Sequence, residues 1–437
     1  MKKIIASVGL AALGVSTLHA QYTPGVTPAE MAKPWSLAVT LRGFYDDNFL
    51  TLHNGPSVRS SYGMEVSPSA SLNHTINNTA FTVSYVYDWR YYEHTSTSDS
   101  QHQLNASVTQ NFSENYRMQV TESFIVAQEP TVVANSGIIS TPLRTEGSNI
   151  HNDGKVAFTA VLTPKLDLQL SYENNLYAYQ QTYGDVVQFP GAPLSPSYSA
   201  LLDRMEQLAT VNLNWKVMND LVGVAGYSYG HTGYTSPEPI IFAGAVGAQS
   251  FGNPGNIKSQ IRDSDSHFFF VGADQTITSK LTGSIRAGGE YLDYYNAHAD
   301  DLSPYVQALM TWTYMKASSL QGMIMHQHSA TDVVGALPGN GKPVLDSETT
   351  SASLSLNQQI TGGLSGWLLG QYQHSDFNGG TVDGQSEDFF IVNMKLGYRF
   401  SEYLTAETGY NWYKLVSDVS GRDYTRNLVY VGVRATY

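Results

Sequence analysis

The chain consists largely of short stretches in which apolar and polar residues alternate. In the last eleven residues, one face would carry Val429, Val431, Val433, Ala435 and Tyr437. The opposite face would carry Leu428, Tyr430, Gly432, Arg434 and Thr436. A period of two predicts a β-strand, because successive side chains of a strand point to opposite faces. A strand with one apolar face and one face that bears an arginine suits a wall between lipid and a wet lumen.

The same alternation recurs from Trp35 to the end of the chain, and almost nothing reads as helix. We expect eighteen strands, which begin near residues 35, 61, 79, 101, 115, 150, 166, 204, 220, 265, 281, 303, 318, 348, 364, 386, 403 and 422. Stretches 265–277 and 364–375 alternate poorly, so sixteen strands is the alternative count. The predicted fold class is all-β, a transmembrane antiparallel up-and-down β-barrel.

Two kinds of connection alternate between the predicted strands. Tight turns fall at 163–166, 218–221, 278–281, 361–364 and 401–404. Long connections rich in Gly, Pro, Ser and Asp fall near 46–60, 128–148, 182–203, 235–263, 330–346 and 376–385. Short periplasmic turns and long extracellular loops are typical of outer-membrane barrels. An even strand count would place both ends of the barrel on the rim with the short turns.

The N-terminal residues predict export from the cytoplasm. Residues 1–20 contain Lys2, Lys3, a short apolar run and Ala20, which is the pattern of a secretory signal peptide. The apolar run is too short to span a bilayer. Residues 21–34 contain three prolines and are predicted to form a flexible periplasmic leader, followed by the barrel at 35–437. The chain has no cysteine, so we expect neither disulfides nor a lipid anchor on cysteine.

Composition narrows the choice of partners. The net charge is −13, and removal of Lys2 and Lys3 with the signal peptide would make it −13 − 2 = −15. An acidic chain is a poor candidate for binding nucleic acid. The 29 tyrosines and the low charged fraction of 14% fit strands whose outer halves face lipid. The expected surroundings are therefore outer-membrane lipid and lipopolysaccharide of a Gram-negative cell.

Two sequence features resemble known barrels. Leu41-Arg-Gly-Phe-Tyr-Asp-Asp-Asn-Phe-Leu50 and Val66-Ser-Pro-Ser-Ala-Ser-Leu72 resemble the first hairpin of the β-barrel porin 2 family. The resemblance implies an outer-membrane barrel and supplies no catalytic residues. The last strand resembles the C-terminal signal read by the outer-membrane barrel assembly machinery, which ends in an aromatic residue. The candidate assembly signal is Tyr437 with Ala435, Val433 and Val431.

Charged residues on the predicted inner faces are the candidates for lining a pore. They are Arg42, Asp88, Arg90, Arg204, Glu206, Arg286, Glu290, Lys395, Arg399, Glu407 and Arg434. Such charges set the field that sorts ions in a channel. The alternative is that they pair across neighbouring strands. Because both signs occur, we expect no strong preference for anions or cations.

Candidate sites for other chemistry are weaker. Asp46, Asp47 and Asn48 could hold calcium together with Asp263 and Asp265, although an Asx turn in a loop is the stronger interpretation. His326 and His328 could pair as metal ligands, but no third ligand stands at a diagnostic spacing. No nucleophile, base and acid can be placed together from spacing. We therefore expect no enzyme, no catalytic residue, no cofactor and no resident metal.

The leading functional prediction is a channel for passive diffusion of small hydrophilic solutes. Two alternatives stay open: a barrel for exopolysaccharide export with a periplasmic partner, and a closed structural or adhesive surface barrel. The long loops 128–148 and 235–263 contain apolar stretches that would avoid water, so either could fold inward and narrow the pore. Burial against a neighbouring copy in a homo-oligomer would shield the same residues from water equally well.

Overall fold

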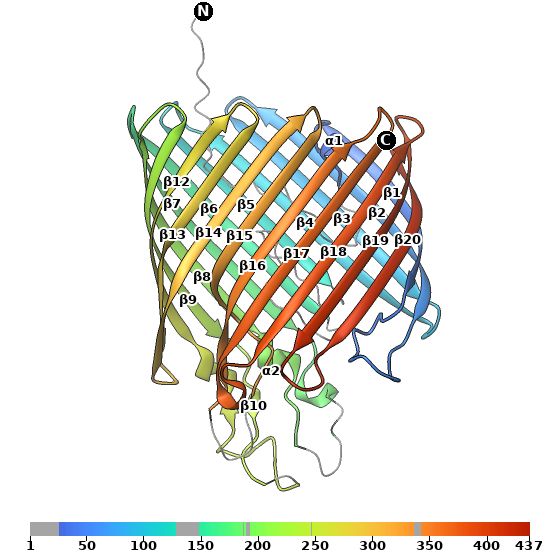
Figure 1. Ribbon diagram of the computed structural model, residues 1–437, viewed down its shortest axis with the longest axis vertical. Coiled ribbons are helices and arrows are strands. Elements are labelled where there is room, and N and C mark those ends of the chain that lie inside the picture. Colours follow the sequence, from blue (N-terminus) through green and yellow to red (C-terminus); the bar gives the residue numbers. More distant parts are fainter. Residues whose placement is uncertain (1–25, 128–147, 187, 189–192, 246, 336–341) are drawn as a thin grey trace, which may run out of the picture.

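The chain forms one closed β-barrel in the computed structural model, which describes residues 26–127, 148–186, 188, 193–245, 247–335 and 342–437 (Figure 1). Eighteen antiparallel strands form a single sheet, and β1 pairs with both β2 and β20. Closure satisfies the backbone groups that an open sheet edge would expose to lipid. Among the described residues, no helix is both long enough and apolar enough to cross a membrane.

The barrel wall consists of long strands. They are β1 (Trp35–Asp46), β2 (Ser61–Ile76), β3 (Thr79–Tyr92), β4 (Thr97–Asn111), β5 (Tyr116–Ala127), β6 (Asn149–Thr163), β7 (Leu166–Tyr179), β8 (Arg204–Lys216), β9 (Leu221–Tyr234), β12 (Ser264–Thr278), β13 (Leu281–Tyr294), β14 (Ala299–Met315), β15 (Ser318–Ser329), β16 (Val344–Gln359), β17 (Leu364–Gly379), β18 (Ser386–Arg399), β19 (Leu404–Ser417) and β20 (Tyr424–Thr436). The connections hold α1 (Pro28–Met31), α2 (Tyr198–Leu202), the hairpin β10 (Pro239–Ile241) and β11 (Ile257–Lys258), and the 3-10 helices η1 (Tyr183–Asp185), η2 (Ser259–Arg262) and η3 (Gly380–Val382).

The predicted fold class and the count of eighteen are confirmed. The largest differences between predicted and observed strand starts are four residues, for example 101 − 97 = 4 at β4. The stretch 265–277 is part of a full strand. Its alternation is poor because it carries apolar residues on both faces. Phe269 is exposed on the outside, whereas Phe268 and Phe270 contact the ring of Tyr305.

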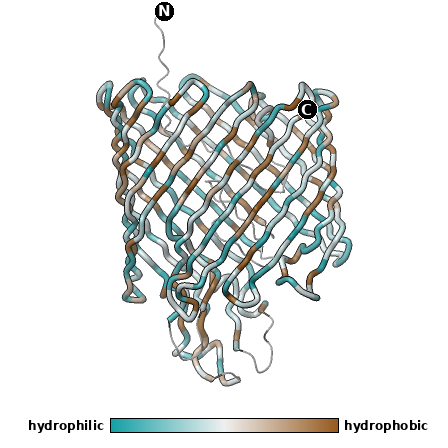
Figure 2. Tube along the Cα trace, viewed as in Figure 1, coloured by the Kyte–Doolittle hydropathy of each residue, from teal (hydrophilic) through white to brown (hydrophobic). Residues whose placement is uncertain are grey.

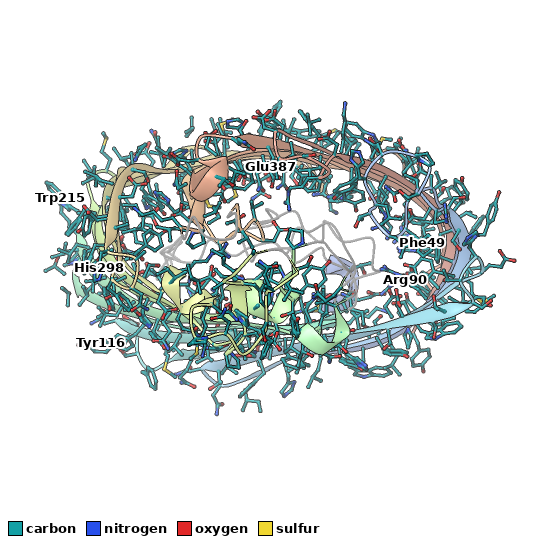
Figure 3. The ribbon with its side chains drawn as sticks, turned by 90° about the horizontal axis from the view of Figure 1, so that it is seen from below. Phe49, Arg90, Tyr116, Trp215, His298 and Glu387 are labelled. Atoms are coloured by element: carbon teal, nitrogen blue, oxygen red, sulfur yellow. The ribbon has the colours of Figure 1, made fainter. Side chains whose placement is uncertain are left out.

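The two faces of the wall differ as the alternation predicts. On β20, Val431 is 66% exposed on the outside, while Arg434 is 4% exposed on the inside. Figure 2 shows the same alternation as apolar and polar positions along the strands. Seen along the barrel, Trp215 and Tyr116 lie on the outside, whereas Arg90 and Glu387 lie on the inside of an elongated opening (Figure 3).

The two rims are built differently. Both ends of the described barrel lie at the rim with the tight turns, and the longer connections gather at the opposite rim (Figure 1). The tight turns share a hydrogen-bond pattern, in which the carbonyl oxygen of Leu221 accepts from the amides of Val217 and Met218. Leu364 and Leu404 accept in the same way from the residues before them. We call the two ends the turn rim and the loop mouth.

Candidate functional site

Charged residues form a continuous row on the inner wall around the seam where the barrel closes. In order along the row they are Asp88, Arg90, Glu65, Arg42, Glu407 and Lys395, from β3, β2, β1, β19 and β18. The closest N···O distances between successive members are 2.9, 3.4, 3.2, 2.5 and 2.7 Å. We call this row the ion ladder. It contains three acids and three bases, so the charges of this part of the wall compensate one another.

A glycine makes the ion ladder continuous across β20. Gly432 is the register partner of Arg42 on one side and of Glu407 on the other. A Cβ atom at Gly432 would lie 2.6 Å from Cγ of Arg42 and 2.3 Å from the carbonyl oxygen of Leu41. Only a residue without a side chain therefore lets Arg42 reach over β20 to Glu407. The guanidinium of Arg42 also lies 4.2 Å from the ring centroid of Tyr430.

Arg434 has a different partner, because it binds the segment that precedes the barrel. Its Nε and Nη2 donate to the carboxylate of Glu30 at 2.9 and 2.7 Å, and Nη1 donates to Thr40 at 2.9 Å. Burial alone would raise the pKa of Glu30, but the bonds and charge of Arg434 outweigh it and hold that pKa below its ordinary value. Residues 26–34, predicted as flexible leader, are thus attached to the inner wall at the turn rim.

The other predicted pore-lining residues also have partners. Arg204 binds Glu206 at 2.6 Å and stacks on Tyr177, and Arg286 binds Asp274 at 2.8 Å. Glu290 accepts from the backbone amide of His328. Arg286 and Asp274 pair across neighbouring strands, whereas Arg204 and Glu206 stand on the same strand, β8.

One of the predicted positions needs correction. The alternation predicts Arg399 on an inner face, among the candidates for lining the pore. It is instead the last residue of β18, exposed at the turn rim, and its Nη2 donates to the carbonyl oxygen of Gly362 at 3.0 Å. Because the long loops gather at the opposite mouth, Arg399 does not face them.

The loop mouth contains an apolar cluster built from three segments. Ile240 and Ile241, in the predicted apolar loop 235–263, are buried against Tyr177 and Tyr179 of β7 together with α2. Glu238 joins the same loop to the connection that contains η1, because the Glu238 carboxylate accepts a hydrogen bond from the amide of Tyr183 at 3.0 Å. Tyr177 and Tyr179 are therefore covered by the loop elements. Figure 3 shows the green and yellow loop elements lying over part of the opening.

Arg262, at the end of η2, joins the loops of the mouth. Its Nε donates to the carbonyl oxygen of Val344 at 2.8 Å and its Nη2 to that of Val333 at 2.6 Å. Its Nη1 donates to the carbonyl oxygens of Thr331 at 3.1 Å and Leu201 at 3.5 Å. The side chain is fully buried, which lowers the pKa of its guanidinium, but arginine starts so high that it keeps its charge. A single guanidinium therefore holds two other connections and the start of β16 by their backbone.

Arg422, between β19 and β20, ties the connection after β15 to the start of β18. It donates to both carboxylate oxygens of Asp332, at 3.1 and 2.9 Å, and to Glu387 at 3.0 Å. Burial alone would lower the pKa of Arg422, but the two carboxylates raise it above its ordinary value. The connection 330–335 is thus held from two sides, by Arg262 and by Arg422.

The candidate calcium residues have other partners. Asp46 accepts from the amide of Asn48 at 3.0 Å, which is the predicted Asx turn, and from Arg426 at 2.8 Å. Asp263 accepts from the amide of Tyr234, and Asp265 binds His231 at 2.8 Å. Within the described ranges, no group of three or more His, Cys, Asp or Glu is arranged to hold a metal ion.

The two candidate histidines face different surroundings. His326 binds Thr350 and Glu348 at 2.7 and 2.9 Å, whereas His328 binds Asp346 at 2.7 Å. They therefore do not act as a pair.

Sequence reasoning missed the residues that organise the loop mouth. Arg262 and Arg422 stand in stretches predicted only as connections, and Glu30 stands in the predicted leader. A lone basic residue in a connection poor in charge is the only local signal, and it does not reveal a partner. The other candidate constriction, 128–148, lies outside the described residues except for Ser148.

The structure and its charges define an outer-membrane β-barrel of the porin type. Residues 232–437 match the family described as "Putative beta-barrel porin 2". The predicted family and the outer-membrane location are thereby confirmed, although the match covers the C-terminal strands and not the first hairpin. Barrels of this family are generally not enzymes. A comparison with curated proteins found no match.

Several solved outer-membrane barrels are similar in fold. OccAB3 of Acinetobacter baumannii has 13% sequence identity and a TM-score of 0.41, over 92% of this chain and 99% of that chain. The outer membrane protein OpdK of Pseudomonas aeruginosa has 11% identity and a TM-score of 0.41, over 92% and 99%. The FrpB iron transporter of Neisseria meningitidis has 12% identity and a TM-score of 0.42, over 89% and 63%. Nothing about a solute follows from likenesses at this level.

Proposed function

We propose that this protein is a channel for passive diffusion of small hydrophilic solutes, narrowed at its loop mouth by loops that fold inward. The observation that carries the proposal is Arg262, whose guanidinium binds carbonyl oxygens of two other connections and of Val344, the first residue of β16. A barrel of eighteen strands is wide enough for an aqueous lumen. Loops held across its mouth would limit the size of solute that enters.

The charge pattern supports weak selectivity. The ion ladder pairs three acids with three bases, and Arg204 and Arg286 have their own carboxylate partners. Paired charges of opposite sign largely cancel at the distance of a passing solute, because their fields oppose each other. We therefore propose that size, more than charge, decides which solutes pass.

The test is the conductance of Arg262→Gln in planar bilayers, compared with the natural sequence and with Arg399→Gln. Glutamine cannot donate to four carbonyls at once, so the loops should separate and the single-channel conductance should rise. Arg399→Gln removes the same charge from the turn rim and should leave the conductance unchanged.

Other outcomes would favour the alternatives. If neither the natural protein nor Arg262→Gln conducts, the closed structural or adhesive barrel becomes the better account. If current appears only when a periplasmic partner is added, a barrel for polysaccharide export is favoured. Equal conductance of an open natural protein and Arg262→Gln would contradict the role of the loops.

A further inference from the structure

The ladder between β14 and β15 is incomplete near the loop mouth. Paired residues run from Met315 and Ser318 to Val306 and His326. Beyond that point β14 continues to Ala299 along β13, and β15 continues to Ser329 along β16. Residues 299–305 of β14 therefore have no register partner on β15. We call this end of the β14–β15 interface the open seam.

Pro304 lies in the unpaired part of β14. It pairs with Gly289 on β13, and it has no N–H group to donate toward another strand. Proline inside a sheet is tolerated at an edge for this reason. The sequence thus gives β14 a local edge in the middle of a closed wall.

Where the backbone ladder stops, contacts that involve side chains join the strands. The backbone amide of His328, on β15, donates to the carboxylate of Glu290 at 3.2 Å, although Glu290 stands on β13, two strands away. The His328 ring binds Asp346 of β16 at 2.7 Å, and its Nε2 lies 3.6 Å from the carboxylate of Asp301. The hydroxyl of Tyr294 also donates to Asp346. Glu290, His328 and Asp346 are all buried.

A row of tyrosine and histidine side chains on the outer surface leads to the open seam. Leu302 is the register partner of Tyr291, which pairs with His267, which in turn pairs with Tyr229. His267 also binds the hydroxyl of Tyr227 at 2.8 Å. Amphipathic rings of this kind collect at the boundary between lipid and water. Such a row beside the seam is typical of a wall region at the outer-leaflet interface.

Apolar surface is present on both sides of the open seam. On the outside, Leu302 is 73% exposed. On the inside, the ring of Tyr305 lies 5.4 Å from that of Phe268 and 5.7 Å from that of Phe270. Both phenylalanines stand on the inner face of β12 and are only half-buried. An apolar group could therefore find favourable contacts on either side of the wall.

We propose that the open seam is a lateral passage between the outer leaflet and the lumen for uncharged amphipathic solutes with an aromatic or alkyl group. Opening a complete ladder within lipid would strand backbone N–H and C=O groups, at several kcal/mol for each. Opening this seam breaks the bond from the His328 amide to the Glu290 carboxylate and the contact of the His328 ring with Asp301, in place of a backbone ladder. The passage adds a second route to the proposed channel and rests on that channel having an open lumen.

The natural absence of cysteine allows a clean test. Ser303 and Ser329 would be opposite each other if the ladder continued, because 303 + 329 equals 306 + 326. The double variant Ser303→Cys/Ser329→Cys, joined by a short bismaleimide, closes the open seam. Leu309→Cys/Met323→Cys, joined in the same way, is the matched control because these residues are already partners in the ladder.

The probe is an alkyl glucoside with a photoreactive diazirine in its alkyl chain, dissolved in the lipid of reconstituted vesicles. Mass spectrometry then locates the labelled residues. In the natural protein and in the cross-linked control we expect label on Phe268, Phe270 and Tyr305. In the cross-linked Ser303→Cys/Ser329→Cys variant, that label should fall several-fold, while outward residues such as Leu302 stay labelled.

A second variant avoids cross-linking altogether. Pro304→Val restores the missing N–H group, so the ladder can extend, and it should also reduce the label on Phe268 and Phe270. Equal inner labelling in locked and control proteins, or no inner labelling of the natural protein, would overturn the proposal. Conductance of the same samples distinguishes the lateral passage from the channel itself, because locking the seam should leave the current carried by small ions unchanged.

Discussion

The ion ladder and the loop mouth both bury arginines, but they neutralise them in different ways. In the ion ladder, Arg42 lies between the carboxylates of Glu65 and Glu407, on strands whose register fixes them at the same height. At the loop mouth, Arg262 binds four backbone carbonyl oxygens, which carry only partial charge. The first arrangement belongs to the wall, and the second joins loops to one another.

The two arrangements should affect different properties. The ion ladder should affect the stability of the barrel, and the loop mouth should affect the access of solutes to the lumen. A buried ion pair on paired strands cannot relax without breaking the barrel, so damage to it should appear as lost stability. Loops can open locally while the wall stays folded, so damage at the mouth should appear as increased access. A variant in each region tests this division, and a variant of the last residue should affect the stability of the folded barrel least.

Removing the centre of the ion ladder should be the most costly change. Arg42→Met leaves Glu65 and Glu407 buried with one cation fewer between them, and we expect a loss of about 3–5 kcal/mol of unfolding free energy. Urea unfolding of the protein in lipid vesicles measures it. Lys155→Met is the control, because Lys155 is 46% exposed and its pair with Glu173 should contribute about 1 kcal/mol at most. Equal effects of the two variants would mean that the ion ladder does not stabilise the wall.

Breaking one contact at the loop mouth should act locally. Asp332→Asn removes a carboxylate from Arg422, which keeps Glu387, and we expect the connection to lose about 1–3 kcal/mol of protection against opening. Amide hydrogen exchange in residues 330–335 should become faster while urea unfolding of the barrel stays the same. Asp383→Asn serves as control, since its carboxylate accepts only from the amide of Gly379 at 2.8 Å. If Asp332→Asn lowered the unfolding free energy of the barrel by the same amount as the protection of the connection, the loop mouth would not open independently of the wall.

The last residue belongs to neither region and should matter least to the folded state. Tyr437 is 70% exposed, and its ring lies 5.5 Å from that of Trp35. Tyr437→Ser should therefore cost only about 0.5–1.5 kcal/mol of stability after refolding. In cells, however, we expect much less heat-modifiable barrel in the outer membrane, because assembly would read the aromatic residue in the unfolded chain. Normal quantities in cells would refute the assembly signal, and a large loss after refolding would assign Tyr437 a structural role.

Much of the wall follows from the sequence alone because its cause is local. Alternation with period two fixes which side chains face lipid, and turn residues fix where each strand ends. These signals placed Val431 outside and Arg42 inside, and they found all eighteen strands. The poorly alternating stretch around Phe269 shows the limit of the rule, since a strand with apolar residues on both faces has no period to detect.

The partners of those residues were decided only by the tertiary structure. Arg42 meets Glu407 because the barrel closes and Gly432 leaves space between them, and neither condition is visible near Arg42 in the chain. Arg262 could not be recognised at all, because its acceptors are backbone carbonyls, which every residue possesses. Pro304 is visible in the sequence, but the seam beside it exists only because Glu290, two strands away, reaches the amide of His328. Faces and turns are properties of neighbours in sequence, whereas closure and loop contacts depend on residues that only folding brings together.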